Sequence, residues 1–315
     1  MKILSAGFVC GDLVLAAVDE LPPSSGNRFV DQAALAIGGC AANAAVGLAR
    51  LLTGADDTVA VAGRVGADPL GDLLRSALAG EGVRTDPLLA TTAATTAINT
   101  VLVSSSGERS FYVFDGACRL FTPADLPDTL LRQFDHLHLA AVGSLAGLAG
   151  DAGADVARRA RALGLTVSLD MTLNPPRAAA ADVLPLLPFV DLFLPNLAEA
   201  QAVLGVTALA DVIQAGLALG VKLLGIKLGA AGCLLATPQE QRFVPGFAVS
   251  AVDTVGAGDA WGAALITGWR QGWTLSELGW FANAAGALCT QQPGATAGMA
   301  TAEEIWAFLA AASRA

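Results

Sequence analysis

Residues 192–227 read LFLPNLAEAQAVLGVTALADVIQAGLALGVKLLGIK, and their pattern predicts an α/β fold. Two short apolar runs, Leu192–Pro195 and Leu223–Lys227, have the length of buried strands. Between them, Leu197–Leu204 and Ala210–Leu219 carry apolar residues at helical spacing. A strand, a helical crossover and a second strand form the unit from which parallel sheets with helices on both faces are built.

The same alternation extends toward the N-terminus. Further strands are predicted at Ile3–Val9, Val59–Ala62, His136–Ala140 and Thr166–Leu169, and further helices at Gly38–Leu52, Asp68–Ala79 and Asp155–Leu163. Two segments, at about 12–36 and 91–120, break the alternation because each contains short apolar runs around a turn signal. We therefore expect one α/β domain over 1–315, with a mainly parallel sheet and a small β element made by these two segments.

Residues 253–259 read Asp-Thr-Val-Gly-Ala-Gly-Asp and carry the clearest chemical signal. The three residues before Asp259 have no bulky side chains, so successive backbone N–H groups can turn toward one anion. The apolar stretch Ala260–Trp269 predicts a helix, whose N-terminus offers free N–H groups and the positive end of a dipole. A carboxylate at such an anion site suits a base that deprotonates a hydroxyl attacking phosphorus.

Polar residues and glycines also follow several predicted strands. They are Asp12, Gly38, Gly39, Asn43, Asp170, Asn174, Asn196, Glu199, Lys227, Gly229 and Gly232. Because open α/β sheets bind ligands beyond the carboxyl ends of their strands, these groups are expected to gather at one edge with Asp259. Two carboxylates and two amides at that edge suit Mg²⁺ held largely through water.

Composition excludes several classes of function. The 315 residues are 54% hydrophobic and 15% charged, which predicts a large buried core. A net charge of −10 argues against a nucleic-acid or anionic-membrane surface, and no run of ~20 mainly apolar residues predicts a membrane span. Met1–Gly7 lacks a signal-peptide pattern, and five cysteines without metal-ligand spacing predict buried thiols in a reducing, cytoplasmic compartment. His136 and His138 are expected in the core.

Together these motifs resemble the ribokinase-like, or PfkB, family of carbohydrate kinases. The resemblance is carried by Gly38-Gly39-(x)3-Asn43, Gly63–Asp68, Asn196-(x)2-Glu199, the Gly229 turn and Asp253–Asp259, and it covers Ile3 to about Ala310. It implies a ribokinase-like three-layer α/β/α fold with a small β-sheet lid. It also implies ATP-dependent phosphorylation of a primary hydroxyl on a small sugar such as ribose or fructose.

The resemblance implies a role for each matching residue. The expected catalytic base is Asp259, beside an anion hole made by Gly256, Ala257 and Gly258. The expected sugar ligands are Asp12, Gly38, Gly39 and Asn43. The residues expected to bind ATP and its Mg²⁺ are Asn196, Glu199 (to Mg²⁺ through water), Lys227, Gly229, Gly232 and Asn283. The expected K⁺ site comprises Asp253 with the carbonyls of Val255, Cys289, Gln292 and Gly294.

The two early β segments resemble the family's lid, so we expect a homodimer formed through them. Arg109 and Tyr112 are candidates to reach the sugar from this lid. Arg64 or Arg109 would favour a substrate with a carboxylate or phosphate group.

Other functions stay open on the same residues. A nucleoside kinase, a 2-keto-3-deoxygluconate-type sugar-acid kinase and a non-catalytic sugar-binding regulator would share this framework. An NAD(P) dehydrogenase is disfavoured because no Gly-x-Gly-x-x-Gly follows the first strand, and no P-loop motif is present. Asn196 and Glu199 also have the spacing of a capping box, Asp259 that of a helix cap, and Lys227 that of a charge at a strand end.

Overall fold

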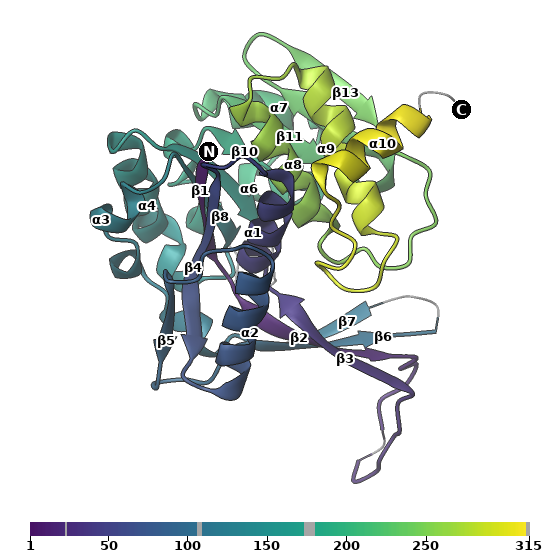
Figure 1. Cartoon of the computed structure of the whole chain (residues 1–315). Helices are drawn as coiled ribbons and strands as arrows, with labels where there is room; N and C mark the ends of the chain where they lie inside the picture. Colours follow the sequence, from purple (N-terminus) through teal and green to yellow (C-terminus); the bar gives the residue numbers. More distant parts are fainter. Residues whose placement is uncertain (23, 106–108, 173–179, 313–315) are drawn as a thin grey trace.

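The computed structural model describes residues 1–22, 24–105, 109–172 and 180–312, and Figure 1 shows two sheets of unequal size. Within these residues the large sheet runs in the order β13-β12-β11-β10-β9-β8-β1-β4-β5. The pairs from β11 to β5 are parallel, whereas β12 and β13 extend the edge in antiparallel fashion. Its strands are β1 Lys2–Gly7, β4 Thr58–Gly66, β5 Leu88–Thr91, β8 His136–Val142, β9 Thr166–Met171, β10 Leu192–Phe193, β11 Leu223–Lys227, β12 Gly232–Ala236 and β13 Gln241–Pro245.

Helices cover both faces of the large sheet because successive strand residues point to opposite sides. In β1, Ile3 packs into one core and Leu4 into the other. The Ile3 face is covered by α1 Cys40–Leu51, α2 Pro69–Gly80, α8 Ala257–Arg270, α9 Leu275–Cys289 and α10 Ala302–Ala312. The Leu4 face is covered by α3 Asp128–Leu131, α4 Gly150–Ala162, α5 Ala180–Val183, α6 Leu197–Leu204 and α7 Leu209–Ala218. The predicted three-layer α/β/α architecture is therefore confirmed.

Short 3-10 helices occupy several connections: η1 Gly116–Leu120, η2 Pro123–Asp125, η3 Ala146–Leu148, η4 Leu187–Phe189 and η5 Gly229–Ala231. Among the described residues no single helix is long and apolar enough to cross a membrane, although α6 with α7, bent by 62°, passes by length and composition together. The buried residues of that pair belong to the core on the Leu4 face.

A four-stranded sheet, called here the small sheet, lies beyond the end of β1 (Figure 1). Its order is β3-β2-β6-β7, with β2 and β6 parallel and both outer pairs antiparallel. Its strands are β2 Cys10–Ala16, β3 Gln32–Gly38, β6 Ile98–Val103 and β7 Arg109–Phe114. They come from the two segments that interrupt the α/β alternation, so the predicted small β element is present.

Two predictions about strands need correction. The first strand ends at Gly7 rather than Val9, so Asp12 lies inside β2 instead of following β1. The strands β5, β12 and β13 were not predicted. β13 is an edge strand with Val244 as its buried residue, so its sequence carries no alternation to detect. Asn174 lies outside the described residues.

Candidate active site

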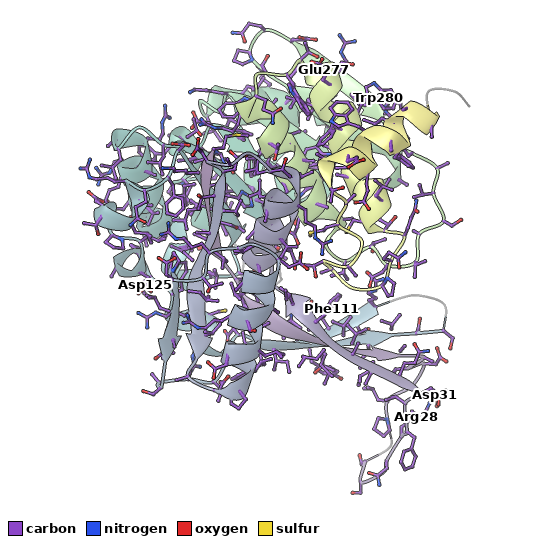
Figure 2. All side chains as sticks on the ribbon, viewed as in Figure 1. Arg28, Asp31, Phe111, Asp125, Glu277 and Trp280 are labelled. Atoms are coloured by element: carbon purple, nitrogen blue, oxygen red, sulfur yellow. The ribbon has the colours of Figure 1, made fainter. Side chains whose placement is uncertain are left out.

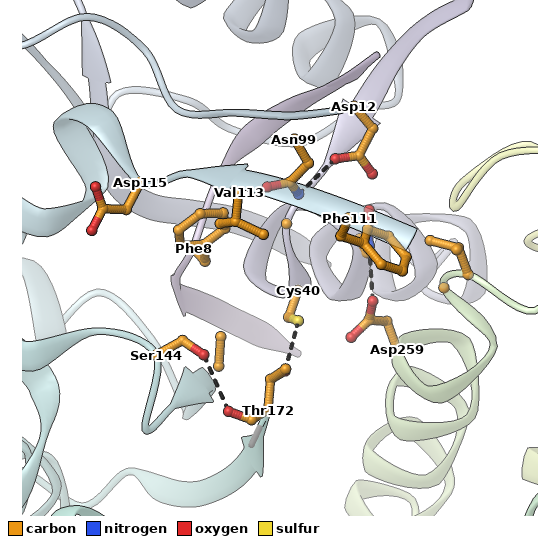
Figure 3. A pocket seen from close by; sticks show the side chains of 15 residues that line it. Phe8, Asp12, Cys40, Asn99, Phe111, Val113, Asp115, Ser144, Thr172 and Asp259 are labelled. Carbon is orange, nitrogen blue, oxygen red and sulfur yellow. Dashed lines mark hydrogen bonds between the residues drawn. The ribbon is translucent and has the colours of Figure 1, made fainter. Parts of the chain in front are cut away.

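A cavity of about 400 Å³ lies between the small sheet and the carboxyl ends of the central strands (Figure 3). Its polar lining residues are Asp12, Asn43, Asn99, Asp115, Ser144, Thr172 and Asp259. Apolar side chains from both sheets complete the wall, among them Phe8 after β1 and Phe111 and Val113 on β7. Three of the four residues expected to bind the sugar, Asp12, Gly39 and Asn43, therefore face the same space as Asp259, and Gly38 does not line it.

Asp259 lies in the first turn of α8, on the wall opposite Asp12 and Asn99 (Figure 3). The amide Nδ2 of Asn43 donates a hydrogen bond of 2.8 Å to its carboxylate. Burial, followed by the negative charge of Asp170, raises the pKa of Asp259 to about 7. A carboxylate with a pKa near neutrality is a stronger proton acceptor than an ordinary aspartate and is still ionised in a large fraction of molecules.

The turn before Asp259, where an anion hole is expected, is tightly packed and precedes the helical hydrogen bonds of α8. Gly256 adopts φ +80°, and a β-carbon there would lie 2.1 Å from the carbonyl oxygen of Ala295. Only glycine fits this position without a clash. Ala260 N donates to Gly256 O at 2.8 Å and begins the helical ladder, so the amides of Gly258 and Asp259 precede that ladder at the positive end of α8.

Lys227, at the end of β11, lies beside this turn. A β-carbon on Gly258 would be 3.5 Å from its Nζ, and Nζ donates to both carboxylate oxygens of Asp170 at 2.9 and 2.7 Å. Burial lowers the pKa of Lys227, but the neighbouring carboxylates, Asp170 foremost, outweigh burial and hold it above its ordinary value. The ammonium group therefore stays charged beside this turn, at the end of β11 and with 16% of its side chain exposed, and its role in binding ATP stays a prediction.

Asp12 and the glycine pair form the opposite wall of the cavity. A β-carbon on Gly38 would lie 2.2 Å from the Asp12 carboxylate, and one on Gly39, at φ +91°, would lie 2.4 Å from Phe8 O. Asn99 Nδ2 donates to Asp12 Oδ1 at 2.9 Å, and burial raises the pKa of Asp12. Glycine is needed at both positions so that Asp12 and the start of α1 can approach each other.

Asn99 is a site residue that the sequence reasoning missed. It lies on β6 and lines the cavity. One signal was available, since asparagine is depleted in strands and this one interrupts the apolar run Ala97–Val103. The Oδ1 atoms of Asn99 and of Asn43 are buried and have no hydrogen-bond partner in the described structure. Both residues line the cavity, but these two oxygens are shielded from it in this structure.

Asn196 and Glu199 form the capping box that their spacing allowed. Asn196 Oδ1 accepts from Glu199 N at 2.8 Å, and Glu199 Oε2 accepts from Asn196 N at 2.8 Å. An isolated β-bridge joins Asn196 to Lys227, and the charge of Glu199 acts on that lysine. The capping box thus holds the buried Glu199 carboxylate near Lys227. Capping the helix is therefore compatible with the expected role of these two residues in binding ATP and Mg²⁺.

The remaining residues expected to bind ATP lie farther along the same edge. Gly229 and Gly232 form the turn between β11 and β12 at φ +60° and +106°. Asn283 is buried in α9, where its amide accepts from Trp261 Nε1 and donates to the carbonyls of Val244 and Pro245, each at 3.0 Å. Its side chain ties α9 to α8 and β13 in this structure.

Asp253 does not stand alone at the expected K⁺ site. Its Oδ1 accepts from Val255 N at 2.7 Å and pairs with Arg109 Nη2 at 2.7 Å, while its Oδ2 accepts from Gly294 N at 2.8 Å. Cys289 Sγ lies 3.8 Å from Val255 O. Gln292 is exposed.

Neither arginine that was considered as a substrate ligand lines the cavity. Arg109 is paired with Asp253, and Arg64 forms a bidentate pair with Asp125 at 2.9 and 2.6 Å. His136 and His138 are buried and share Ser168 Oγ, each at 2.8 Å, so their prediction as core residues is confirmed.

Comparison with known proteins matches the chain, over residues 2–302, to the model of the pfkB family carbohydrate kinases. The ATP-dependent ribose-1-phosphate kinase of Halopiger xanaduensis is 32% identical over 309 residues, covering 98% of each protein. The fructokinase of Vibrio alginolyticus is 29% identical and covers 96% of this chain and 98% of its own. The structure of Arabidopsis thaliana ribokinase complexed with ribose and ATP has a TM-score of 0.82 at 26% identity, with 98% of each chain covered.

Proposed function

Because the chain belongs to the pfkB family of carbohydrate kinases, we propose that it transfers the γ-phosphoryl group of ATP to a primary hydroxyl of a small neutral sugar. The observation that carries the proposal is that one cavity is lined by the Asp259 carboxylate, at a helix N-terminus, together with Asp12, Asn43 and Asn99. Asp259 accepts the proton of the attacking hydroxyl. The resulting alkoxide attacks phosphorus in line with the departing ADP oxygen.

The sugar side of the cavity is built to accept hydrogen bonds. Asp12 offers a carboxylate, and Asn43 and Asn99 line the same space. Their Oδ1 atoms are buried without a partner, and a hydroxyl donor that reached them would recover the free energy that an unpaired buried acceptor costs. A polyol carries several such donors, so this arrangement supports a sugar as the bound molecule.

The lining also favours a neutral substrate over an anionic one. Asp12, Asp115 and Asp259 bring negative charge to the cavity, and no lysine or arginine lines it among the described residues. A sugar phosphate or a sugar acid would add like charge to three carboxylates. The ribose-1-phosphate kinase among the relatives therefore marks an alternative to test, as does the sugar-acid kinase that the sequence left open.

The phosphate side combines backbone and side-chain charge. The amides at the start of α8 and the ammonium of Lys227 would stabilise negative charge developing on the transferred group. The buried carboxylate of Glu199 near Lys227 supplies hard oxygen donors that fit Mg²⁺, which would neutralise the ATP phosphates when bound, whereas both oxygens of Asp170 pair with Lys227. The residues expected to bind ATP, Gly229, Gly232 and Asn283, stay predictions, and the amide of Asn283 is already engaged by the protein.

Four further expectations belong to this proposal: the lid, the homodimer, the cytoplasmic location and the K⁺ site. The small sheet would act as a lid over the sugar within a single kinase domain, with Phe111 and Val113 closing the apolar side of the cavity. Its outer strand β7 exposes Tyr112 and Phe114, at 58% and 46%, which supports a homodimer formed through this sheet. A cytoplasmic location stays a prediction from the cysteines. The K⁺ site also stays a prediction, and its charged donor, Asp253, is paired with Arg109.

The test is a substrate panel with Mg·ATP, followed as ADP release. Ribose, fructose, ribose-1-phosphate, 2-keto-3-deoxygluconate and adenosine cover the neutral, phosphorylated, acidic and nucleoside classes. The proposal expects the highest kcat/KM with a neutral sugar. A preference for the phosphorylated or acidic compound would refute the neutral class, and sugar-dependent binding without ADP release would indicate a non-catalytic binding protein.

A further inference from the structure

The small sheet reaches across the cavity and contacts the segment that leads into the anion hole. Arg109, the first residue of β7, pairs with Asp253, which begins the segment 253–259. The guanidinium also donates to Thr254 Oγ1 at 3.3 Å. In Figure 1, β7 lies next to the loops that precede α8 and follow α9. The contact therefore joins two elements that are 144 residues apart in the chain.

This ion pair is shielded from solvent. The side chains of Arg109 and Asp253 are 11% and 9% exposed, and the N–O distance is 2.7 Å. Partly buried pairs are screened much less by salt than surface pairs. Removing one partner would leave the other charge buried without compensation.

The pair also bears directly on the shape of the anion hole. Asp253 Oδ1 accepts from Val255 N and its Oδ2 accepts from Gly294 N, so one carboxylate holds together the loop that precedes α8 and the loop after α9 that packs against Gly256. Arg109 balances the charge of the group that holds these backbone amides. A monovalent cation at the expected K⁺ site would have to be coordinated by the same Asp253 carboxylate.

Strand geometry links the same pair to the sugar side. Side chains alternate along a strand, so Arg109, Phe111 and Val113 share one face of β7. Phe111 and Val113 line the cavity, and Figure 3 shows them opposite Asp259. Anchoring Arg109 to Asp253 therefore holds the apolar face of β7 over the space where the sugar would bind.

We infer that Arg109 is a positioning residue whose guanidinium takes the place of a bound monovalent cation beside Asp253, at the start of the segment 253–259. It neutralises Asp253 and couples the small sheet, closed over the cavity, to the turn that forms the anion hole. The loop then keeps its shape without a bound monovalent cation. The expected effect of Arg109 on the sugar-kinase rate rests on the proposed function. The expected effect of Arg109 on the shape of the loop rests on the ion pair alone.

The first measurement uses the unmodified protein. Melting temperature and sugar-kinase rate are compared in potassium chloride and in tetramethylammonium chloride at equal ionic strength. Both should be the same in the two salts, because the cation of the loop is covalently part of the chain. A melting temperature or a rate that depends on K⁺ would overturn the inference, and the melting temperature needs no knowledge of the substrate.

The second measurement compares Arg109→Gln with a matched control. Arg242 forms an exposed pair with Glu240 at 3.2 Å on β13, so Arg242→Gln removes an arginine–carboxylate pair away from the cavity. Arg109→Gln should lower kcat/KM by about 10- to 100-fold, the usual range for coupling between two sites, and Arg242→Gln should match the unmodified protein. Arg109→Lys, which keeps the charge, should recover part of the loss. Equal behaviour of Arg109→Gln and Arg242→Gln would overturn the inference.

The two proposals fail in distinguishable ways. If the unmodified protein phosphorylates no sugar, the proposed function fails, while the melting temperatures in the two salts still decide the role of Arg109. If the unmodified protein is an active sugar kinase that requires K⁺, the proposed function stands and the inference fails. If Arg109→Gln does not fold, the salt comparison on the unmodified protein remains decisive.

Discussion

At the scale of single residues, the proposed mechanism depends on the protonation state of Asp259. Its pKa of about 7 arises first from burial and then from the charge of Asp170. A general base works as the carboxylate, so kcat/KM should rise with pH up to about 7 and level off above it. If the base were an aspartate with an ordinary pKa near 3.9, kcat/KM would already be constant over the pH range in which Asp259 titrates.

Asp170→Asn tests the origin of that pKa. Removing the Asp170 charge takes away a cause that raises the pKa of Asp259, so the rising limb of the pH profile should move to lower pH. The profile of kcat/KM between pH 5 and pH 9 is the measurement. A limb that stays in place or moves to higher pH would contradict this assignment.

Asn99 provides a second prediction at residue scale. Asn99→Ala removes a buried acceptor and the donor to Asp12, so the KM for the sugar should rise by about tenfold while the KM for ATP stays unchanged. Asn27→Ala, at an exposed position in the β2–β3 connection, is the matched control. Equal changes in both KM values would mean that Asn99 acts on the fold rather than on the sugar.

These residues also show which parts of the candidate site could be predicted from the sequence and which could not. Asp259 was predictable because a small-residue turn and a helix start lie next to it in the chain. Asn99 and the Arg109–Asp253 pair were not, because both depend on how the small sheet packs against distant segments. The pairing of Lys227 with Asp170 likewise needs two strand ends to be brought together by the sheet order.

At the scale of elements, the turn that begins α8 depends on a glycine. Gly256→Ala places a β-carbon 2.1 Å from Ala295 O, so the turn must move and kcat should fall by about 100-fold or more, as for loss of an oxyanion donor. Gly272 also has φ +80°, but a β-carbon there meets nothing within 4 Å. Gly272→Ala therefore carries the same backbone strain without the clash.

The comparison of kcat in the two glycine variants separates strain from obstruction. Gly272→Ala should retain the turnover of the unmodified protein and lose only stability, which thermal melting measures. If both variants lose turnover to the same extent, the anion hole has no special role at Gly256. If neither loses it, the turn does not bind the transferred group.

The strands and helices of the central alternation were predictable, whereas β5, β12 and β13, at the two ends of the large sheet, were not. The strands β8, β9 and β11 and the helices α6 and α7 match their predicted ranges closely, because the strands are short and almost fully buried and the helices carry apolar residues at helical spacing. β13 escaped prediction because its residues are mostly exposed. The end of β1 was placed two residues late, since the apolar sequence continues through Phe8 and Val9 into the small sheet.

At the scale of the whole molecule, the small sheet leaves its outer strand uncovered. β7 is an edge strand, and Phe111 to Phe114 are each about half exposed, at 46–58%. Figure 2 shows the side chains of this sheet standing clear of the large sheet, with Arg28 and Asp31 on the part that projects farthest. An exposed apolar edge of this kind favours pairing with a second copy.

Tyr112→Lys tests the homodimer. Tyr112 belongs to the face of β7 opposite Phe111, so a charge there should weaken self-association and leave the cavity intact. Phe243→Lys, on the exposed edge strand β13 of the large sheet, is the matched control at 54% exposure. Sedimentation velocity should show a monomer for Tyr112→Lys and a dimer for Phe243→Lys. A dimer in both would place the interface elsewhere.

The most direct test of the account as a whole is the turnover of Asp259→Asn with Mg·ATP and the best sugar of the panel. Loss of a general base should reduce kcat by about 10²- to 10⁴-fold, while the Kd for ATP, measured by calorimetry, stays close to that of the unmodified protein. Turnover within a few-fold of the unmodified protein would contradict the assignment of Asp259 as the base, and with it the proposed mechanism.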